Sequence, residues 1–492
     1  MPQRFDCDCK DCLRTSNHFI QSALYKLQAT EDTREMILSL KAKIGLGVLL
    51  SYTSFELYMQ IRTQSVITKR KQEFKKLKES SLSGTALDVD YVKFKSATVA
   101  GMFVNPFDEY RPQTAFEFLL VRILEAFESI YANSFELHNK IPGDAGEGGK
   151  DIEDVLKSHK PDLAILRQNS LILQKCLELN DFRQLSEPST SSFFQRLPKL
   201  RDQLIFTWLG QSCSLVQVSG INILTDPILS NHLISPSIGP KRLVPAPLTL
   251  EDINYATNNK VDFVFVSHDH PDHLELDLVK KIGNKTTWIV PLGLKKKLNR
   301  KGIYNVIEMD WWDTLPLNEY IKSNSGVPTA LADKYEVVCL PAMHWSGRYI
   351  IDSNKSLWCS FVIRRNGESL VYHAGDTGYS KELFQTIGEI FGPLKLALLP
   401  IGQYCPSWHQ KPRHISPEES IKIAQHLRSE SVMGVHWGTF KISSEPILEP
   451  KILLEEIAKD QGKPEHYLAP KLGMTYLYDL SNQKPAKESS VN

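Results

Sequence analysis

The chain has little cysteine, almost no net charge and no clean apolar run of membrane-spanning length. Eight cysteines in 492 residues are too few and too scattered for a disulfide scaffold. With a formal net charge of +1, the chain has no overall positive potential that would attract nucleic acid. No nucleic-acid motif or internal repeat is visible. We therefore predict no nucleic-acid partner. An apolar fraction of 42% is ample for a core, and the length predicts two or three domains or one large domain with extensions.

Three of the cysteines lie near the N-terminus, at Cys7, Cys9 and Cys12, with His18 close by. These residues could hold a metal, but the spacing fits no common zinc pattern. We expect a disordered tip instead. Basic and acidic residues are mixed in this region, so its composition matches a signal peptide poorly and a transit peptide only weakly.

The main apolar stretch, residues 44–61, is interrupted by Glu56. A spanning helix needs roughly 20 mostly apolar residues, and a carboxylate at the bilayer centre costs ~3 kcal/mol. The basic run 69–78 follows, and such a run is attracted to anionic lipid at ~1 kcal/mol per charge. We expect residues 44–78 to span a membrane or to lie on its surface. Packing of 44–61 on the protein and solvation of the basic run are the alternatives.

Turn and linker residues divide the rest of the N-terminal part. Residues 142–150 and 186–192 have linker composition, and a helical pattern begins after a cap at Thr114. We divide this part into an extension, 1–95, and a helical segment, 96–200.

Short apolar runs recur from residue 201 to residue 480, with turns and helical patterns between them. Strands are expected at 204–208, 214–218, 221–225, 261–266, 287–290, 336–340, 358–363, 369–373, 395–400 and 432–436. Helices are expected at 274–283, 416–428 and 450–459. This alternation predicts one large α/β domain. The polar residues 481–492 are expected to form a disordered tail.

The run 261–266 ends in three histidines and two aspartates within six positions. His268, His270, Asp272 and His273 form the spacing His-x-His-x-Asp-His. Imidazole and carboxylate are ligands of zinc and similar ions, and open α/β sheets place their sites at the carboxyl ends of strands. The cluster predicts a metal site there, although histidines that are merely hydrogen-bonded in a loop remain the alternative.

Three further candidates follow apolar strands later in the chain: His344, Asp376 and His436. Alone, each is weak, because a histidine after a strand is often a core or loop residue. Together with the six-residue cluster they supply five histidines and two aspartates. That set suits two metals that share one bridging carboxylate.

This order of ligands resembles the metallo-β-lactamase superfamily, and the surrounding phrases resemble its N-acylphosphatidylethanolamine-hydrolysing phospholipase D family more closely. The phrases are Trp208-Leu-Gly, Leu224-Thr-Asp-Pro-Ile228, Gly239-Pro-Lys-Arg242, Val290-Pro-Leu-Gly-Leu294, Glu308-Met-Asp-Trp-Trp312, His344-Trp345, Ala374-Gly-Asp-Thr-Gly-Tyr379, Phe391-Gly-Pro393, Pro400-Ile-Gly402, Pro417-Glu-Glu419 and His436-Trp-Gly-Thr-Phe440. They cover roughly residues 204–445, about half the chain, and Asn105-Pro106 resembles the family's N-terminal segment. The resemblance implies a four-layer αβ/βα sandwich with a helical, partly membrane-associated N-terminal extension.

The resemblance also implies two zinc ions. One would lie on His268, His270 and His344, the other on Asp272, His273 and His436, with Asp376 as the bridge. Asp272 or Asp376 would act in catalysis by orienting the attacking hydroxide and relaying its proton.

Two positions are implied to contact substrate. His414 matches a family histidine that faces the substrate phosphate, and a plain loop histidine is its alternative. Pro271 stands where animal relatives have a tyrosine that touches substrate. Gln211 replaces a common family histidine, and Arg413 replaces a glutamine of animal relatives. None of these departures removes a metal ligand, but Pro271 and Arg413 put fine substrate preference in doubt.

The implied activity is hydrolysis of N-acylphosphatidylethanolamine to an N-acylethanolamine and phosphatidate by a metal-bridged hydroxide. The similarity to fungal members implies a mitochondrial location, at the inner membrane. The chain has no duplicated His-x-Lys motif, so a covalent phosphohistidine route is not expected. Two alternatives stay open: the same metal core acting on another ester, a lactone or a thioester, and a catalytically inactive, membrane-tethered lipid-binding scaffold. The sequence does not indicate an oligomeric state.

Overall fold

The structure is a computed structural model. It describes residues 40–80, 91–114, 116, 117, 119–121, 123, 124, 156–186, 199–235, 239–322, 331, 333–349, 352–482 and 486–489. The cluster of Cys7, Cys9, Cys12 and His18 lies outside the described residues, as do the linker 142–150 and most of the linker 186–192.

Two β-sheets form the centre of the fold. The first has the order β17-β16-β3-β4-β5-β6-β7-β8, and the second has the order β15-β14-β13-β12-β11-β10-β9. The first comprises β3 (Gln203–Gly210), β4 (Cys213–Val218), β5 (Ile221–Thr225), β6 (Phe263–Phe265), β7 (Thr287–Pro291), β8 (Val306–Met309), β16 (Thr475–Asp479) and β17 (Lys487–Ser489). The second comprises β9 (Thr314–Pro316), β10 (Tyr335–Leu340), β11 (Ser360–Arg365), β12 (Glu368–His373), β13 (Leu394–Pro400), β14 (Ser429–Val435) and β15 (Tyr467–Leu468). Each of the ten expected strands overlaps one of these.

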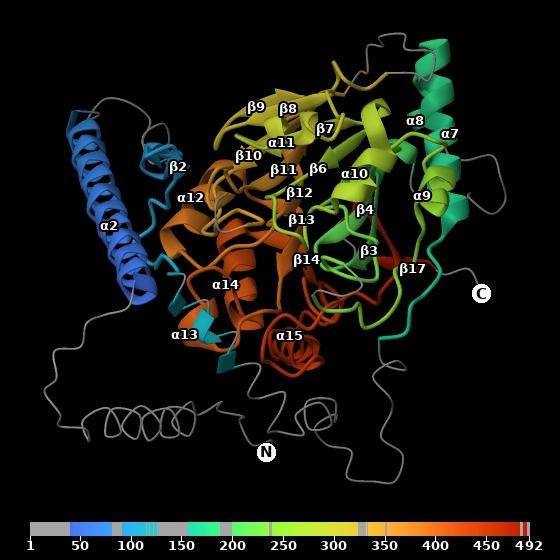
Figure 1. Ribbon diagram of the computed structural model, residues 1–492. Coiled ribbons are helices and arrows are strands. Elements are labelled where there is room, and N and C mark those ends of the chain that lie inside the picture. Colours follow the sequence, from blue (N-terminus) through green and yellow to red (C-terminus); the bar gives the residue numbers. More distant parts are fainter. Residues whose placement is uncertain are drawn as a thin grey trace, which may run out of the picture. The chain divides into compact units, whose positions relative to one another are not determined.

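Helices cover the outer side of each sheet (Figure 1). The first sheet carries α7 (Leu163–Leu179), α9 (Leu250–Ala256), α10 (Leu276–Ile282) and α11 (Lys295–Asn299). The second carries α12 (Lys381–Phe391), α14 (Pro417–Leu427) and α15 (Glu449–Asp460). The order helix, sheet, sheet, helix confirms the expected four-layer sandwich.

The side chains of β3 show why the sheets stack in this way. Successive residues of a strand point to opposite faces, and every residue of β3 is buried. Phe206 and Trp208 belong to the core shared with the second sheet, whereas Ile205 and Leu209 pack under the outer helices. Phe265 of β6 and Phe361 of β11 meet between the sheets, with ring centroids 5.2 Å apart. A strand buried on both faces is mostly apolar, as β3 is apart from Gln203 and Thr207.

Each sheet is antiparallel in one half and parallel in the other. Strands β5 to β8 are parallel in the first sheet, and β12 to β15 are parallel in the second. The carboxyl ends of parallel strands lie at one edge of a sheet. The residues that follow β5, β6, β12 and β14 are therefore delivered to a common place.

The expected domain boundaries at residues 95 and 200 do not coincide with the division seen in the structure. The division falls between Gln60 and Ile61, so the second unit comprises residues 61–492. Helix α7 belongs to the second unit because it buries Ile165 and Leu166 in the layer outside the first sheet. Its 17 residues were expected to lie in a segment preceding the catalytic domain.

The expected disordered tail is wrong for residues 487–489. These residues form β17, which pairs antiparallel with β16. An edge strand such as β17 tolerates polar side chains, because it forms backbone hydrogen bonds with one neighbour without burying both of its faces. The remainder of the tail beyond Asn482 is described only at residue 486.

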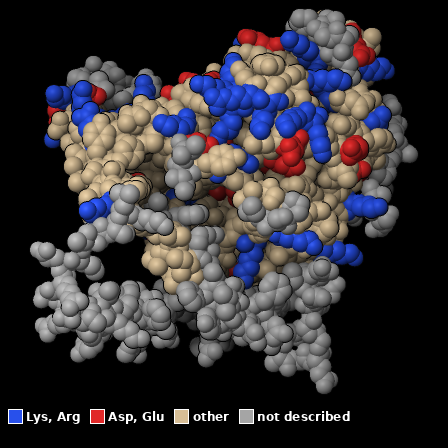
Figure 2. All heavy atoms as spheres, in the orientation of Figure 1, with Lys and Arg blue, Asp and Glu red and all other residues tan. Residues whose placement is uncertain are grey.

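Residues 44–61 and 69–78 lie in one helix, α2 (Leu40–Ser80). Along its first half several large apolar side chains are exposed, among them Ile44, Val48 and Leu57. Among the described residues, no helix has both the length and the apolar character required to cross a membrane. Elsewhere, Figure 2 shows lysine and arginine side chains gathered over α11 and the neighbouring α10, which contribute Lys296, Lys297 and Lys280.

Candidate metal centre

The first ligand cluster comprises His268, His270 and His344, all buried. His268 and His270 follow β6, and His344 follows β10. His270 Nδ1 lies 2.8 Å from His268 Nε2 and 3.2 Å from His344 Nε2. Three imidazole nitrogens thus converge on one point.

The second cluster comprises Asp272, His273, Asp376 and His436, also buried. His273 Nε2 lies 3.2 Å from both His436 Nε2 and Asp376 Oδ2. His436 Nε2 lies 3.3 Å from Asp272 Oδ2 and 3.1 Å from Asp376 Oδ1. Asp376 Oδ2 is also 3.7 Å from His344 Nε2, so this carboxylate lies between the two clusters.

These separations fit bound metal. Zinc binds nitrogen and oxygen at about 2.0–2.2 Å, and tetrahedral ligands at that length are about 3.3 Å apart. The donor pairs of the second cluster are separated by 3.1 to 3.6 Å. The chemistry of the donors, five imidazoles and two carboxylates, also suits zinc or a similar ion.

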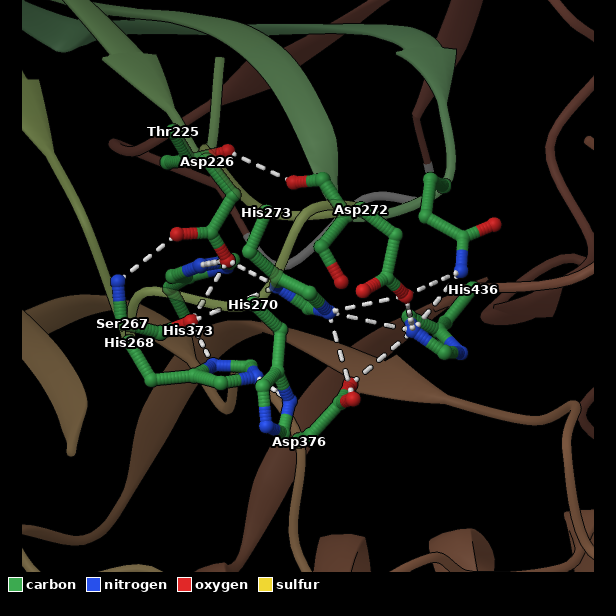
Figure 3. A network of polar contacts seen from close by, with 12 residues as sticks. Thr225, Asp226, Ser267, His268, His270, Asp272, His273, His373, Asp376 and His436 are labelled. Atoms are coloured by element: carbon green, nitrogen blue, oxygen red, sulfur yellow. Dashed lines mark hydrogen bonds and ion pairs between the residues drawn. The ribbon is translucent and has the colours of Figure 1, made fainter. Parts of the chain in front are cut away.

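Asp226, directly after β5, orients the second cluster (Figure 3). Its Oδ2 lies 2.9 Å from His273 Nδ1 and 2.9 Å from His373 Nε2. Its Oδ1 accepts a 2.7 Å hydrogen bond from the backbone N–H of Ser267. A carboxylate on the far nitrogen of a ligating histidine fixes the ring and its tautomer, so Asp226 points Nε2 of His273 toward the cluster.

Backbone conformation also shapes the site. His436 has φ of 62°, in the left-handed region that is costly for a non-glycine residue. Gly375, just before Asp376, has φ of 58°, and a Cβ there would lie 2.5 Å from Ser267 Cβ. Only glycine allows the loop after β12 to approach the loop after β6 this closely, which brings Asp376 between the two clusters.

The histidines of the first cluster have lowered pKa values, which favour binding of a cation. Burial lowers the pKa of His270 and of His344 to about 3. Burial and the neighbouring His273 and His270 hold the pKa of His268 well below its usual value. All three rings are therefore neutral at pH 7, with free lone pairs.

The second cluster behaves differently. Burial opposes charge on His436, but Asp376 and Asp272 outweigh burial and raise its pKa to about 9. Burial also opposes charge on His273, and Asp376, Asp272 and Asp226 raise its pKa well above the usual value. Burial would raise the pKa of Asp376, yet His273 and His436 hold it well below its usual range.

Metal uptake by protein stripped with chelator is therefore expected to release protons. Below the raised pKa values of His273 and His436, each ring carries a proton that a metal must displace. At pH 7.5 we expect release of about one to two protons per chain, and affinity that rises as pH increases toward 9. Calorimetric titration in two buffers of different ionisation enthalpy measures this release. A binding enthalpy independent of buffer would contradict it.

The residues expected to contact substrate lie at the same edge. His414 is buried, and its Nδ1 is 3.7 Å from Asp376 Oδ2 and has no hydrogen-bond partner. Pro271 is half-buried in the turn between His270 and Asp272. Their roles toward substrate stay predictions.

Arg413 is not free to face a ligand. Its guanidinium donates to the backbone oxygens of His409 and Arg111, and its own backbone oxygen lies 2.9 Å from His344 Nδ1. The side chain therefore ties the loop that carries His414 to the N-terminal segment.

Five aromatic side chains of the catalytic domain differ in their positions relative to the ligands. Trp345 lies over the site, with its ring 4.2 Å from that of His270. Trp311 is buried, and its Nε1 donates to the backbone oxygen of Trp358. Trp312 packs against Phe391, Tyr404 donates to Glu449, and Trp408 is exposed on α13 (Ser407–Gln410).

The N-terminal segment reaches the site through Asn105. This buried side chain donates a 2.7 Å hydrogen bond from Nδ2 to the backbone oxygen of His344. Phe107 is buried beside Trp311, with ring centroids 6.1 Å apart. The two residues anchor the segment on the loop that carries a ligand.

Replacing Asn105 by alanine is expected to weaken the first cluster. The backbone oxygen of His344 would lose a buried donor, at a cost of about 1–3 kcal/mol. We expect about a tenfold loss of metal affinity, the lower end of the effect of outer partners. Chelator competition measures it. Asn318→Ala is the control, because Asn318 likewise donates to a backbone oxygen, that of Asp333, away from the site. Equal affinities in the two variants would contradict the role of Asn105.

Several site residues were not assigned by sequence reasoning. Asp226 lies within the phrase Leu224-Thr-Asp-Pro-Ile228 but received no role of its own, and His373 is marked only by its position at the end of β12. Gln211 was noted only as a departure, yet its Nε2 lies 3.0 Å from Asp272 Oδ2 and 2.9 Å from His436 Nε2. The aspartate after a strand end was the one available clue, since all the ligands follow strands.

Comparisons with known proteins agree with this geometry. Residues 221–437 match the family model described as a beta-lactamase superfamily domain. The chain is 39% identical over 444 residues to the mitochondrial N-acyl-phosphatidylethanolamine-hydrolyzing phospholipase D of Saccharomyces cerevisiae, covering 88% of this chain and 87% of the relative. It is 36% identical over 282 residues to N-acyl-phosphatidylethanolamine-hydrolyzing phospholipase D 1 of Caenorhabditis elegans, covering 55% of this chain and 74% of the relative.

Among solved structures, Igni18, a metallo hydrolase from Ignicoccus hospitalis, matches with 26% identity and a TM-score of 0.40, covering 56% of this chain and 98% of Igni18. The yeast relative matches over most of both chains, including the N-terminal part outside the sandwich. With its ligand order and fold, the chain belongs to the N-acylphosphatidylethanolamine-hydrolysing phospholipase D family of the metallo-β-lactamase superfamily.

Proposed function

We propose that the protein hydrolyses N-acylphosphatidylethanolamine to an N-acylethanolamine and phosphatidate, with two zinc ions, at a mitochondrial membrane. The observation that carries the proposal is the position of Asp376 between two ligand clusters, with carboxylate oxygens 3.1 Å from His436 Nε2 and 3.7 Å from His344 Nε2. A shared carboxylate of this kind suits a two-metal phosphodiester hydrolase. The names of the yeast and nematode relatives support the lipid substrate.

His268, His270 and His344 would hold one metal, and Asp272, His273 and His436 the other. Bound there, the pair would supply Lewis acidity and a water of lowered pKa. Asp272 or Asp376 would orient the attacking water and relay its proton, since both carboxylates remain ionised. The unpartnered Nδ1 of His414 is placed to donate to a phosphate oxygen of the substrate. Trp345 covers His270 and limits access of bulk water.

Two apolar surfaces support contact with a membrane. The first lies on α2, where apolar side chains from Ile44 to Ile61 are exposed. The second lies in unit 61–492, where helical residues after the Thr114 cap expose Leu119, Leu120, Ile123 and Leu124. Exposed apolar patches rimmed by polar residues mark interaction sites. The name of the yeast relative includes the word mitochondrial, which supports the mitochondrial part of the proposal. The inner membrane stays a prediction.

The second surface is connected to the site. Glu117 on its helix accepts from Arg111 at 2.6 Å and lies 2.8 Å from Nδ1 of His409 on α13. Trp408, next to His409, is exposed and is held by Arg111 through its backbone oxygen. A bilayer bound by this surface would lie close to the loop that carries His414.

Product analysis by mass spectrometry tests the activity. Purified protein is given N-acylphosphatidylethanolamine in phospholipid vesicles, an acyl lactone and an acyl thioester in parallel. We expect release of N-acylethanolamine and phosphatidate. Rapid turnover of the lactone or thioester without turnover of the lipid would reject the proposed substrate.

Metal content tests the cofactor and the inactive scaffold. Elemental analysis is expected to find two zinc ions per chain, and chelation is expected to lower the melting temperature because bound metal stabilises the folded state. Less than one metal per chain, together with an unchanged melting temperature on chelation, would favour the scaffold. Sedimentation with vesicles measures membrane binding directly, and no sedimentation would reject both surfaces.

A further inference from the structure

Gln211 occupies the turn between β3 and β4, beside the second ligand cluster. Its side chain is 1% exposed, and its φ is 52°. The backbone N–H donates to Thr439 Oγ1 at 2.6 Å, and the backbone oxygen accepts from Trp208 Nε1 at 2.7 Å and from the His436 N–H at 3.0 Å. Three bonds therefore hold the residue in a conformation that is unfavourable for most side chains, and direct its amide into the site.

The side-chain amide of Gln211 lies close to the donor atoms of two proposed metal ligands. The atom assigned as Nε2 is 3.0 Å from Asp272 Oδ2 and 2.9 Å from His436 Nε2. Ligands that are 90° apart around zinc, with bonds of about 2.1 Å, are separated by about 3.0 Å. The terminal group of Gln211 thus lies where a fifth ligand of the same metal would lie.

The orientation of the amide follows from charge. In this structure the NH2 group of Gln211 donates to the Asp272 carboxylate. With a cation bound, His436 Nε2 has no lone pair left to accept a bond, and an N–H directed at the ion is repelled. The amide oxygen is the only donor of Gln211 with lone pairs for a metal. The two ends of an amide exchange by a simple rotation.

We propose that Gln211 is a fifth ligand, through its amide oxygen, of the metal on Asp272, His273 and His436. The inference rests on the proposed ligand set. A neutral oxygen raises the coordination number of this metal without adding charge. The two metals would then differ in their additional neighbour, because Gln211 lies beside the second cluster, whereas His414 lies beside His344 and Asp376.

Cobalt-substituted protein tests the proposal without substrate. The full chain is stripped, loaded with Co2+ and compared with Gln211→Leu by visible absorption and by chelator competition. Four-coordinate Co2+ absorbs more strongly than five-coordinate Co2+, so the variant is expected to show stronger bands. We also expect one of its two metals to bind about 10–100-fold more weakly, in the range seen when partners of a metal site are removed.

Two further variants distinguish the loss of a metal ligand from a folding defect. Gln211→Glu supplies a carboxylate oxygen at the same reach and is expected to bind the second metal more tightly than wild type. Gln211→His supplies a nitrogen donor and is expected to restore the weaker bands. Identical spectra and affinities in wild type, Gln211→Leu and Gln211→Glu would overturn the inference, as would equal weakening of both metals in Gln211→Leu. Fewer than two Co2+ ions in wild type would instead reject the proposed ligand set.

Discussion

Replacing Asp376 by asparagine is expected to lower kcat/KM on N-acylphosphatidylethanolamine by more than about a hundredfold, since loss of even an outer partner of a metal ligand costs 10–100-fold. The substitution keeps the size of the side chain and removes its charge. Asp376 Oδ1 lies 3.1 Å from His436 Nε2, and Oδ2 lies 3.2 Å from His273 Nε2. A neutral amide cannot bridge two cations through two oxygens, so both metals are expected to bind more weakly.

Lipid product analysis and elemental analysis of the same preparations measure the two effects. Asp262→Asn is the matched control, because Asp262 is equally buried but precedes β6, at the opposite end of the strand from the ligands. Burial raises the pKa of Asp262, although Lys260, whose Nζ lies 3.3 Å from Asp262 Oδ1, opposes this shift. Unchanged release of N-acylethanolamine by the Asp376→Asn variant would refute the bridging role.

Replacing Asp226 by asparagine is expected to impair both stability and metal binding. One oxygen of Asp226 lies 2.9 Å from His273 Nδ1, 2.9 Å from His373 Nε2 and 2.8 Å from Ser267 Oγ. The pKa of Asp226 falls to about 2, because His373 and His273 outweigh the effect of burial. Loss of one partner from a buried charged network costs about 3–5 kcal/mol. We also expect metal affinity to fall about 10–100-fold.

Urea unfolding and chelator competition separate these two effects. The loss of stability is expected with and without chelator, because the contacts of Asp226 join residues of both sheets whether or not metal is bound. The loss of affinity is expected at the second cluster, which contains His273. Wild-type affinity in a variant that unfolds at lower urea would limit Asp226 to a structural role.

The strands could be predicted largely from the sequence, but their partners could not. The run from Val261 to Val266 is apolar except for Asp262, and the structure buries all of it. Such a run is a local signal. The tail was misjudged because β17 depends on β16 as a partner and has no apolar pattern of its own. The expected boundary at residue 200 follows α7, and only the sheet beneath this helix identifies it as part of the sandwich.

Candidate ligands were predicted for a local reason as well. His268, His270, Asp272 and His273 lie within six residues, and few structural environments require such a set. His344, Asp376 and His436 could be added because each follows a strand that was itself predicted. The structure places all seven of these side chains in two adjoining clusters.

By itself, the sequence determined the α/β class, the succession of strands and the candidate ligands, because apolar periodicity and residue type act over a few positions. Only the tertiary structure decided which residues orient those ligands. Asp226 is 47 residues from His273, and Asn105 is 239 residues from His344. Gln211 is 225 residues from His436. Contacts of this range depend on which strand ends meet, and two parallel half-sheets bring those ends together at one edge.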